Sequence, residues 1–428
     1  GMGSAEVTNA QLFNKKVLGN DEPLLMTTFP VVSLITTHSA SSDVTDSAAA
    51  GTALSTGHKT KNGMLGMNAD TVAVTSIART LFENGYGVGL VTTVAIDDAT
   101  PGAFYTHVSH RSMFYEIGKD LAESGYQFAA GASLRGTKDK DGNDNGLMDL
   151  FKKNNVAVSY GLDGIDKKAK KQLVLSPFHD KMSNEVGLAV DSLENALTLP
   201  EMTQACLDHL MRTNPKKFFM MVEGGKIDWA CHGNDPATVF EEVVDMDNAI
   251  KVAYEFYKKH PKETLIVVTA DHETGGLGLG TGKYELQLKA LAKQKQSQDI
   301  LSRSITDLRK MRKVINWPEM KEFLAEKMGF WKELPVSWEQ EKMLRDAYEE
   351  SFVNKHVVFE ESLYAKTEPL AVAAKKVMSQ IAMVGWTSGG HTAGYVPVFA
   401  VGAGSKLFVG KMDNTEIPKR IAKAGGYK

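Results

Sequence analysis

The chain has 428 residues, 43% of them hydrophobic and 24% charged, and its formal net charge is −3. This length allows a sizeable core, in one large α/β domain or in two or three smaller domains. The balanced charge argues against a strongly basic surface, so we expect no nucleic-acid partner. No apolar run reaches the roughly 18–20 residues of a membrane span.

The compartment of the protein is left open by its sequence. The first residues, from Gly1, lack the basic start and apolar middle of a signal peptide. Cys206 recurs with apolar residues at helical spacing and is predicted to be a buried small hydrophobe. Cys231 precedes a candidate metal ligand, and the spacing of the two cysteines does not support a disulfide.

The first candidate for chemistry is Ser47, which directly follows Asp46 and precedes a run of small residues. A serine there would lie at a helix N-terminus, where unpaired N–H groups and the helix dipole favour a phosphate. An ordinary cap before an alanine-rich packing helix explains this segment equally well.

Short apolar runs alternate with amphipathic segments through most of the chain. We expect buried strands at Val88–Val94, Phe218–Val222, Leu265–Thr269 and Val396–Val401, and helices at Val72–Phe82, Pro200–Arg212 and Pro236–Lys259. This alternation predicts a three-layer α/β/α domain with a mainly parallel central sheet. Ligands of such folds bind beyond the carboxyl ends of the strands, where the polar motifs of this chain also fall.

A carboxylate and an imidazole follow the second of these strands. Asp228 and His232 are four residues apart, so on one helical turn both side chains face the same point. Such a pair suits zinc, and Glu223 at the strand tip offers a harder oxygen ligand. A surface Asp–His pair on a helix is the alternative.

Two further motifs lie later in the chain. Asp271 and His272 leave the apolar strand at 265–269 for a glycine-rich loop, an unusual place for two polar residues, although a capped turn would also explain them. His391 lies in another glycine-rich loop, where a single histidine is commonly solvated.

Between these motifs, residues 281–384 differ in character from the rest. Apolar residues recur at helical spacing amid Lys, Arg and Gln, with a capping box at Ser337 and Gln340 and a stop at Gly329. We interpret 281–384 as a helical insertion, or crown, in a catalytic domain formed by 1–280 and 385–428. Its expected role is to cover the site; a role in substrate selection is the alternative.

Taken together and in this order, the four motifs resemble those of the alkaline phosphatase family. The resemblance covers Thr36–Gly276 and Gly385–Val401. It implies an alkaline phosphatase-like α/β fold and hydrolysis of phosphate monoesters through a phosphoserine intermediate. It also implies two zinc ions, one magnesium ion and an optimum above neutral pH.

The resemblance assigns a role to each matching residue. Ser47 would be the nucleophile, Arg111 would grip two phosphate oxygens, and Asp46 would orient Arg111. The implied metal ligands are Asp228, His232 and His391 for one zinc, Asp271 and His272 for the second, and Glu223 and Thr100 for magnesium. Asp98 and Trp229 would lie near the phosphate and tune the rate, whereas His107 and His110 match no ligand of the family.

One expected feature of the family is missing. Its members begin with an apolar strand ending in Gly-Asp-Gly-Met-Gly, whose aspartate bridges the second zinc and the magnesium. This chain begins at Gly1 and Met2, as if cut just after that aspartate. A shortened chain or a naturally degenerate protein would explain this, and the intact later motifs favour the first. We therefore expect the second zinc and the magnesium to bind weakly.

Other functions compete with phosphomonoester hydrolysis. A phosphodiesterase of the same superfamily is the closest alternative, and a catalytically impaired phosphate- or metal-binding homologue is the other. A sulfatase is disfavoured because the chain lacks the Cys/Ser-x-Pro-x-Arg motif. The resemblance alone suggests a homodimer and a periplasmic or secreted location.

Overall fold

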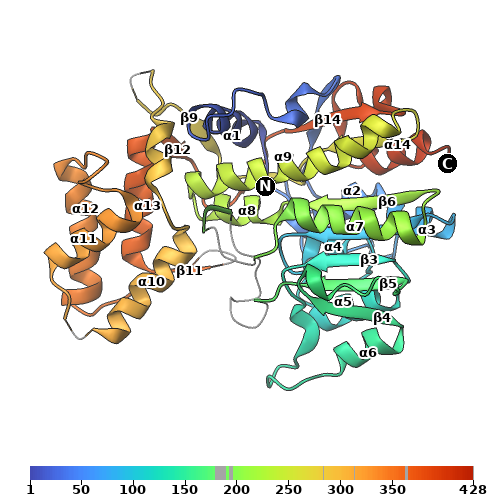
Figure 1. The fold of residues 1–428 in the computed structure, drawn as a ribbon, viewed down its shortest axis with the longest axis horizontal. Coiled ribbons are helices and arrows are strands. Elements are labelled where there is room, and N and C mark those ends of the chain that lie inside the picture. The colour runs from blue at the N-terminus through green and yellow to red at the C-terminus, as the bar shows by residue number, and fades with distance from the viewer. Residues whose placement is uncertain (179–188, 192–195, 283, 313, 362–364, 428) are drawn as a thin grey trace.

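The structure, a computed structural model, describes residues 1–178, 189–191, 196–282, 284–312, 314–361 and 365–427. Five strands form a sheet in the order β4-β5-β3-β2-β6, and every pairing in it is parallel. These strands are β2 (Gly87–Thr92), β3 (Phe128–Gly131), β4 (Val156–Tyr160), β5 (Lys171–Leu175) and β6 (Phe218–Glu223). The expected parallel sheet is therefore present (Figure 1).

Helices cover both faces of this sheet. On one face, β2 and β5 pack against apolar residues of α3 (Ile77–Glu83), α5 (Phe114–Glu123) and α6 (Leu147–Lys153). On the other face, β3 packs against α7 (Leu199–Thr213), beside which lies α9 (Pro236–Lys259) (Figure 1). This arrangement confirms the α/β class predicted from the alternation of strands and helices.

A second sheet has the order β15-β1-β14-β7. Its strands are β1 (Val31–Thr36), β7 (Leu265–Val268), β14 (Val396–Gly402) and β15 (Met412–Asp413). β14 runs antiparallel to both β1 and β7, so the parallel arrangement does not extend across this sheet. A continuous apolar run indicates burial on both faces but does not encode the direction of the strand.

The helices predicted from the sequence are present, with one boundary in error. α9 spans the predicted residues, and α7 exceeds its prediction by one residue at each end. α3 begins at Ile77 rather than at Val72, because the side chain of Ser76 accepts a hydrogen bond from the backbone N–H of Arg79 and caps the helix.

Four helices of the second half of the chain lie together, apart from both sheets (orange in Figure 1). They are α10 (Gln298–Met311), α11 (Trp317–Met328), α12 (Trp338–Tyr348) and α13 (Pro369–Ala382). The predicted capping box joins Ser337 and Gln340 at the start of α12. Gly329 ends α11 in the left-handed conformation, with φ 73°.

A cavity of about 770 Å³ lies between β6 and β7, the end strands of their sheets. Residues along both strands line it, so the side chains of β6 are half-buried rather than fully buried as expected. At the carboxyl ends of the strands the lining includes Ser47, Arg111 and Asp271. The candidate site therefore occupies one end of this cavity.

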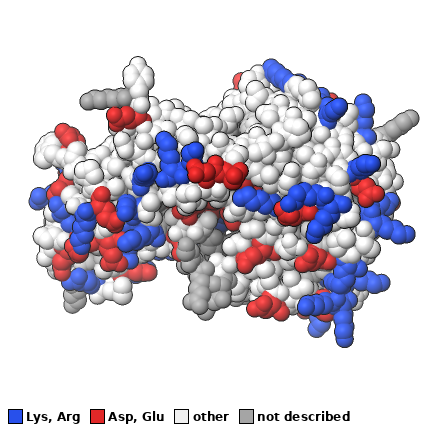
Figure 2. All heavy atoms as spheres, turned by 45° about the horizontal axis from the view of Figure 1, so that its top comes forward, with Lys and Arg blue, Asp and Glu red and all other residues white. Residues whose placement is uncertain are grey.

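The surface shows no segregation of charge on the face seen in Figure 2, where Lys and Arg are interspersed with Asp and Glu. Among the described residues, no helix has both the length and the apolar content needed to cross a bilayer. Cys206 and Cys231 are both buried free thiols, so the two do not form a disulfide.

The contact between β2 and α7 gives a test of this packing. A methyl group at Gly89 would collide with Sγ of Cys206 and lie 3.0 Å from Cδ1 of Leu210. Gly89→Ala should therefore lower the free energy of unfolding by about 1–3 kcal/mol, because overpacking strains the core. Urea denaturation measures the loss. The double variant with Cys206→Ala should lose less than the sum of the single variants, and additive losses would contradict the contact.

Candidate active site

Ser47 is the first residue of α2 (Ser47–Thr56) and is buried at the carboxyl-end rim of the cavity. The cap of this helix is Asp46, whose Oδ1 accepts a hydrogen bond from the backbone N–H of Ala49 at 2.9 Å. The serine hydroxyl is thus not used for capping. It lies at the positive end of the helix dipole, where developing negative charge is stabilised.

Two histidines meet with their lone pairs facing each other. Nδ1 of His232 lies 2.7 Å from the carbonyl of Gly389, and Nδ1 of His391 lies 2.7 Å from the carbonyl of Thr45. Each Nδ1 must therefore carry the proton, which leaves both Nε2 atoms as acceptors. These Nε2 atoms are 3.1 Å apart, and Asp228 approaches them at 3.4 and 3.6 Å. Such a convergence fits a divalent metal ion.

A second convergence surrounds the serine. Nε2 of His272 lies 3.1 Å from Oγ of Ser47 and 3.0 Å from Oδ2 of Asp271. Nδ1 of His272 contacts Oγ1 of Thr274 at 3.1 Å, and the Thr274 hydroxyl donates to Asp228. Because that hydroxyl can only accept from the ring, Nδ1 carries the proton and Nε2 faces Ser47 as a lone pair. The amino group of Gly1 donates to Oδ1 of Asp271 at 2.9 Å.

Short strand pairing brings these distant parts of the chain together. β8 (Glu273–Thr274) and β13 (His391–Thr392) are antiparallel, with His391 opposite Thr274. The rings of His272 and His391 stack with centroids 3.5 Å apart. Asp228, His272 and His391 each place one ligand atom within 4.8 Å of the others. The implied ligands of the two zinc ions thus form one continuous cluster.

Burial and charge prepare these groups to bind a cation. Burial opposes the charged form of Asp228, yet a proton on the facing nitrogen of His232 or His272, which occupies the place of a cation, holds the pKa of this carboxyl well below its usual range. The pKa of Asp271 is also lowered despite burial, chiefly by His272. Burial, and then the charge that His272 carries whenever it is protonated, lower the pKa of His391 to about 4, so this ring is neutral at pH 7.

Glu223 ends β6 beside the cavity, opposite Thr92 at the end of β2. The hydroxyl of Thr92 donates to Oε2 of Glu223 at 2.5 Å. Burial, strengthened by the charges of Asp271 and Asp98, raises the pKa of Glu223 to about 8, although hydrogen bonds with Thr92 and Thr100 oppose the rise. A buried carboxylate flanked by hydroxyl groups suits a hard cation such as Mg²⁺.

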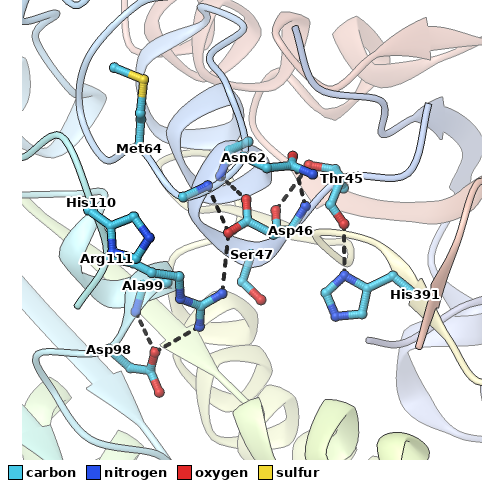
Figure 3. A network of polar contacts seen from close by, with 12 residues as sticks. Thr45, Asp46, Ser47, Asn62, Met64, Asp98, Ala99, His110, Arg111 and His391 are labelled. Atoms are coloured by element: carbon cyan, nitrogen blue, oxygen red, sulfur yellow. Dashed lines mark hydrogen bonds and ion pairs between the residues drawn. The ribbon is translucent and has the colours of Figure 1, made fainter. Parts of the chain in front are cut away.

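Arg111 is held between two carboxylates (Figure 3). Its Nη2 lies 3.1 Å from Oδ1 of Asp98, and its Nη1 lies 3.4 Å from Oδ2 of Asp46. Asp98 caps α4 (Ala99–Gly102) by accepting from the N–H of Ala99 at 2.7 Å. Two helix caps therefore fix the guanidinium beside Ser47, as a phosphate-binding fork requires.

The remaining candidates lie at the edge of this cluster. Trp229 follows Asp228, and its ring has Nζ of Lys226 at 4.7 Å and the guanidinium carbon of Arg135 at 5.5 Å from its centroid. His107 binds the carbonyl of Gly66, and His110 contacts Ser112, both away from the metal cluster.

Sequence reasoning missed three residues that the structure places here: Thr92, Thr274 and Arg135. Each contacts a predicted site residue through its side chain. The position of Thr92 at the end of an apolar strand was the one usable signal. Thr274 in β8 and Arg135 at the start of a short helix belong to no sequence pattern that distinguishes them.

Comparison with known proteins bears on the family to which the chain belongs. The model of the family described as "Alkaline phosphatase" matches residues 1–132 and 116–427. Alkaline phosphatase 3 of Bacillus subtilis is 33% identical over 390 residues, which cover 90% of this chain and 78% of that protein. The alkaline phosphatase of Schizosaccharomyces pombe is 30% identical over 409 residues, covering 89% and 71%.

The chain belongs to the alkaline phosphatase family. Solved structures agree: a cold-active alkaline phosphatase from Shewanella sp. has a TM-score of 0.82 at 29% identity, covering 99% of this chain and 97% of that one. The enzyme from Thermus thermophilus also has a TM-score of 0.82, at 26% identity, covering 100% and 90%. This chain is accordingly a phosphomonoester hydrolase of a metal-dependent family, and the resemblance seen in its motifs is confirmed.

The Thr274 hydroxyl provides a test of the cluster, because it joins His272 to Asp228. Thr274→Val keeps the shape but removes both hydrogen bonds, so affinity for a divalent metal should fall about 10–100-fold. Competition for Zn²⁺ with a chromogenic chelator measures this. Thr203→Val on α7 is the matched control, since its buried hydroxyl donates to the carbonyl of Leu199 on the same helix. Equal zinc affinity in the two variants would contradict the assignment.

Proposed function

We propose that this chain hydrolyses phosphate monoesters through a phosphoserine formed on Ser47, with an optimum above neutral pH. The observation that carries the proposal is the position of the Ser47 hydroxyl. It lies at the N-terminus of α2, 3.1 Å from Nε2 of His272, beside the Asp228–His272–His391 cluster. Arg111, fixed by Asp46 and Asp98, lies on its other side (Figure 3).

In this mechanism Oγ of Ser47 attacks the phosphorus in line with the ester oxygen. The bond from phosphorus to Oγ forms, the bond to the ester oxygen breaks, and the alcohol leaves with a proton. Water then cleaves the phosphoserine, restoring the Ser47 hydroxyl and releasing inorganic phosphate. Arg111 holds two of the remaining oxygens as a bidentate fork and offsets their charge, while the helix dipole of α2 adds to this effect.

We propose two zinc ions and one magnesium ion as cofactors, and the donor chemistry supports each site. Asp228, His232 and His391 would hold the first zinc, Asp271 and His272 the second, and Glu223 with Thr100 the magnesium. When bound, these ions supply Lewis acidity to the phosphate oxygens and to the Ser47 hydroxyl. A solved variant of the TAB5 alkaline phosphatase, 26% identical with a TM-score of 0.66, is described with magnesium bound.

We also propose roles for the helical insertion and for a second copy of the chain. Residues 281–384 would form a crown over a catalytic domain made of 1–280 and 385–428. The chain would act as a periplasmic or secreted homodimer. Exposed apolar side chains on β1, Val32 and Leu34, are consistent with a partner surface. Light scattering at several protein concentrations tests the dimer, and a monomer throughout would exclude it.

The nucleophile is tested by Ser47→Ala. The variant should lose turnover of p-nitrophenyl phosphate by at least about 10³-fold at pH 8–10 with added zinc and magnesium, because no other group forms the covalent intermediate. Ser76→Ala, which removes a serine from the start of α3, is the control and should retain turnover. Mass spectrometry of acid-quenched wild-type enzyme should find phosphate on Ser47.

Full turnover by Ser47→Ala would refute the phosphoserine. A wild-type preference for bis-p-nitrophenyl phosphate over the monoester would favour a phosphodiesterase instead. Phosphate binding without turnover of either ester would indicate an impaired homologue.

The metal assignment predicts that alanine variants of two histidines differ in zinc content. His391→Ala should release the first zinc, so elemental analysis after dialysis should show about one zinc fewer than in His107→Ala, whose ring lies outside the cluster. We expect the second zinc to be retained more weakly in the wild type, because two side chains rather than three hold it. Zinc at about 100 times its Kd should stabilise the wild type by about 2.7 kcal/mol. Equal zinc content in the two variants would overturn the assignment.

A further inference from the structure

We propose that Arg135 is a positioning residue that holds Asp98 and thereby sets the phosphate affinity of Arg111. The inference rests on the proposed function, since it concerns how the same site grips phosphate. Arg135 begins the short helix η2 (Arg135–Thr137), which follows β3, so it approaches the site from a different element than Arg111 does.

The two arginines share one buried carboxylate. Oδ1 of Asp98 pairs with Nη2 of Arg111 at 3.1 Å, and Oδ2 pairs with Nη1 of Arg135 at 3.3 Å. The Asp98 side chain is only 6% exposed. Within the described part of the chain, Oδ2 accepts no hydrogen bond, so its charge is offset by the ion pair with Arg135. Without that pair, a buried carboxylate oxygen would be left uncompensated, which is unfavourable.

Arg135 is itself rigidly placed. Its backbone N–H donates to Oδ1 of Asp97 at 3.0 Å, and the N–H of Gly136 donates to Oδ2 of Asp97 at 2.7 Å. The neighbouring Asp97 and Asp98 thus hold the backbone and the side chain of Arg135, respectively. Its guanidinium also lies over the rings of Phe114 and Trp229, at 5.4 and 5.5 Å from their centroids. These contacts leave the guanidinium little freedom to turn away from Asp98.

The phosphate affinity of Arg111 depends on how the negative charge of Asp98 is shared between Arg111 and Arg135. Asp98 and Asp46 both offset the charge of Arg111, and the same charge must attract the phosphate. Because Arg135 forms an ion pair with the second oxygen of Asp98, the Asp98 carboxylate offsets less of the positive charge of Arg111. Removing Arg135 would let Asp98 turn fully towards Arg111 and compete with the phosphate. Arg135 therefore acts through Asp98 rather than by touching the substrate.

The test is the affinity for inorganic phosphate, measured by isothermal titration calorimetry on zinc- and magnesium-loaded enzyme. Arg135→Ala should bind phosphate roughly tenfold more weakly. Arg135→Lys, which keeps the charge but loses the fork, should restore part of the affinity. The matched control is Arg79→Ala, because Arg79 also combines an ion pair, with Glu83, and a ring contact, with Phe82, outside the site. Its phosphate affinity should equal that of the wild type.

A double-mutant cycle with Asp98→Asn separates positioning from direct contact. In the Asp98→Asn background, Arg135→Ala should change phosphate affinity less than about twofold, since the carboxylate through which it acts is gone. An equal loss in both backgrounds would mean that Arg135 contacts phosphate itself and would overturn the inference. Unchanged phosphate affinity with a lowered Tm would show a merely structural role and would overturn it too.

Two further outcomes are distinguishable. If Arg135→Ala does not fold, Arg135→Lys and Arg135→Gln decide the matter by the same cycle, with the glutamine variant expected to bind phosphate more weakly than the lysine variant. A loaded wild-type enzyme that binds no phosphate would overturn the proposed function and this inference with it. A wild type that binds phosphate with an affinity unaffected by Arg135 would overturn this inference alone.

Discussion

Electron-rich groups that point at one another are the constraint on which this site depends. The Nε2 atoms of His232 and His391 face each other at 3.1 Å, and Asp228 lies against both. Lone pairs and carboxylates at such distances repel unless a cation lies among them. The rest of the site keeps these groups in place: backbone carbonyls fix the protons on the far side of each ring, and the pairing of β8 with β13 fixes His391 beside His272.

The residue expected to bind phosphate, Arg111, is likewise held in place by fixed partners. Arg111 is a long, flexible side chain, and its use as a fork requires that its rotamers be restricted before substrate arrives. Asp46 and Asp98 achieve this from two helix N-termini. Asp46 caps its helix with Oδ1 and contacts Arg111 with Oδ2, whereas Oδ1 of Asp98 accepts from its helix and also pairs with Arg111. Helix capping and the positioning of Arg111 therefore use the same two residues, and a substitution at either would disturb both.

Much of the fold was accessible from sequence because burial leaves a pattern. Apolar runs located β2, β6, β7 and β14 to within two residues, and α9 was predicted at both ends. Strand direction was not accessible, because β14 reads as buried whether it runs parallel or antiparallel. The half-burial of β6 depends on the cavity beside it, which is a property of the whole arrangement.

For the site, the sequence motifs predicted residues that the structure brings close together, including the single loop histidine His391. The four-residue spacing of Asp228 and His232 on one helical turn predicted that their side chains converge, as they do at 3.4 Å. Arg135 and Thr274 show no such spacing relative to Asp98 and Asp228, the partners far away in sequence that their side chains contact. The fold brings these partners together.

The alanine-rich run after Ser47 can be interpreted either as a packing helix with an ordinary cap or as a helix whose N-terminus binds phosphate, and the two interpretations are compatible. A Cβ at Gly51 would already lie 3.2 Å from Cβ of Ala103 and 3.3 Å from Cα of Thr100, so α2 and α4 approach each other closely. Only small residues allow this approach. It sets Ser47 at the start of α2 beside Asp98 and Thr100 at the start of α4. The packing of this run thus places the proposed nucleophile Ser47, the carboxylate partner of Arg111 and a candidate magnesium ligand at one rim.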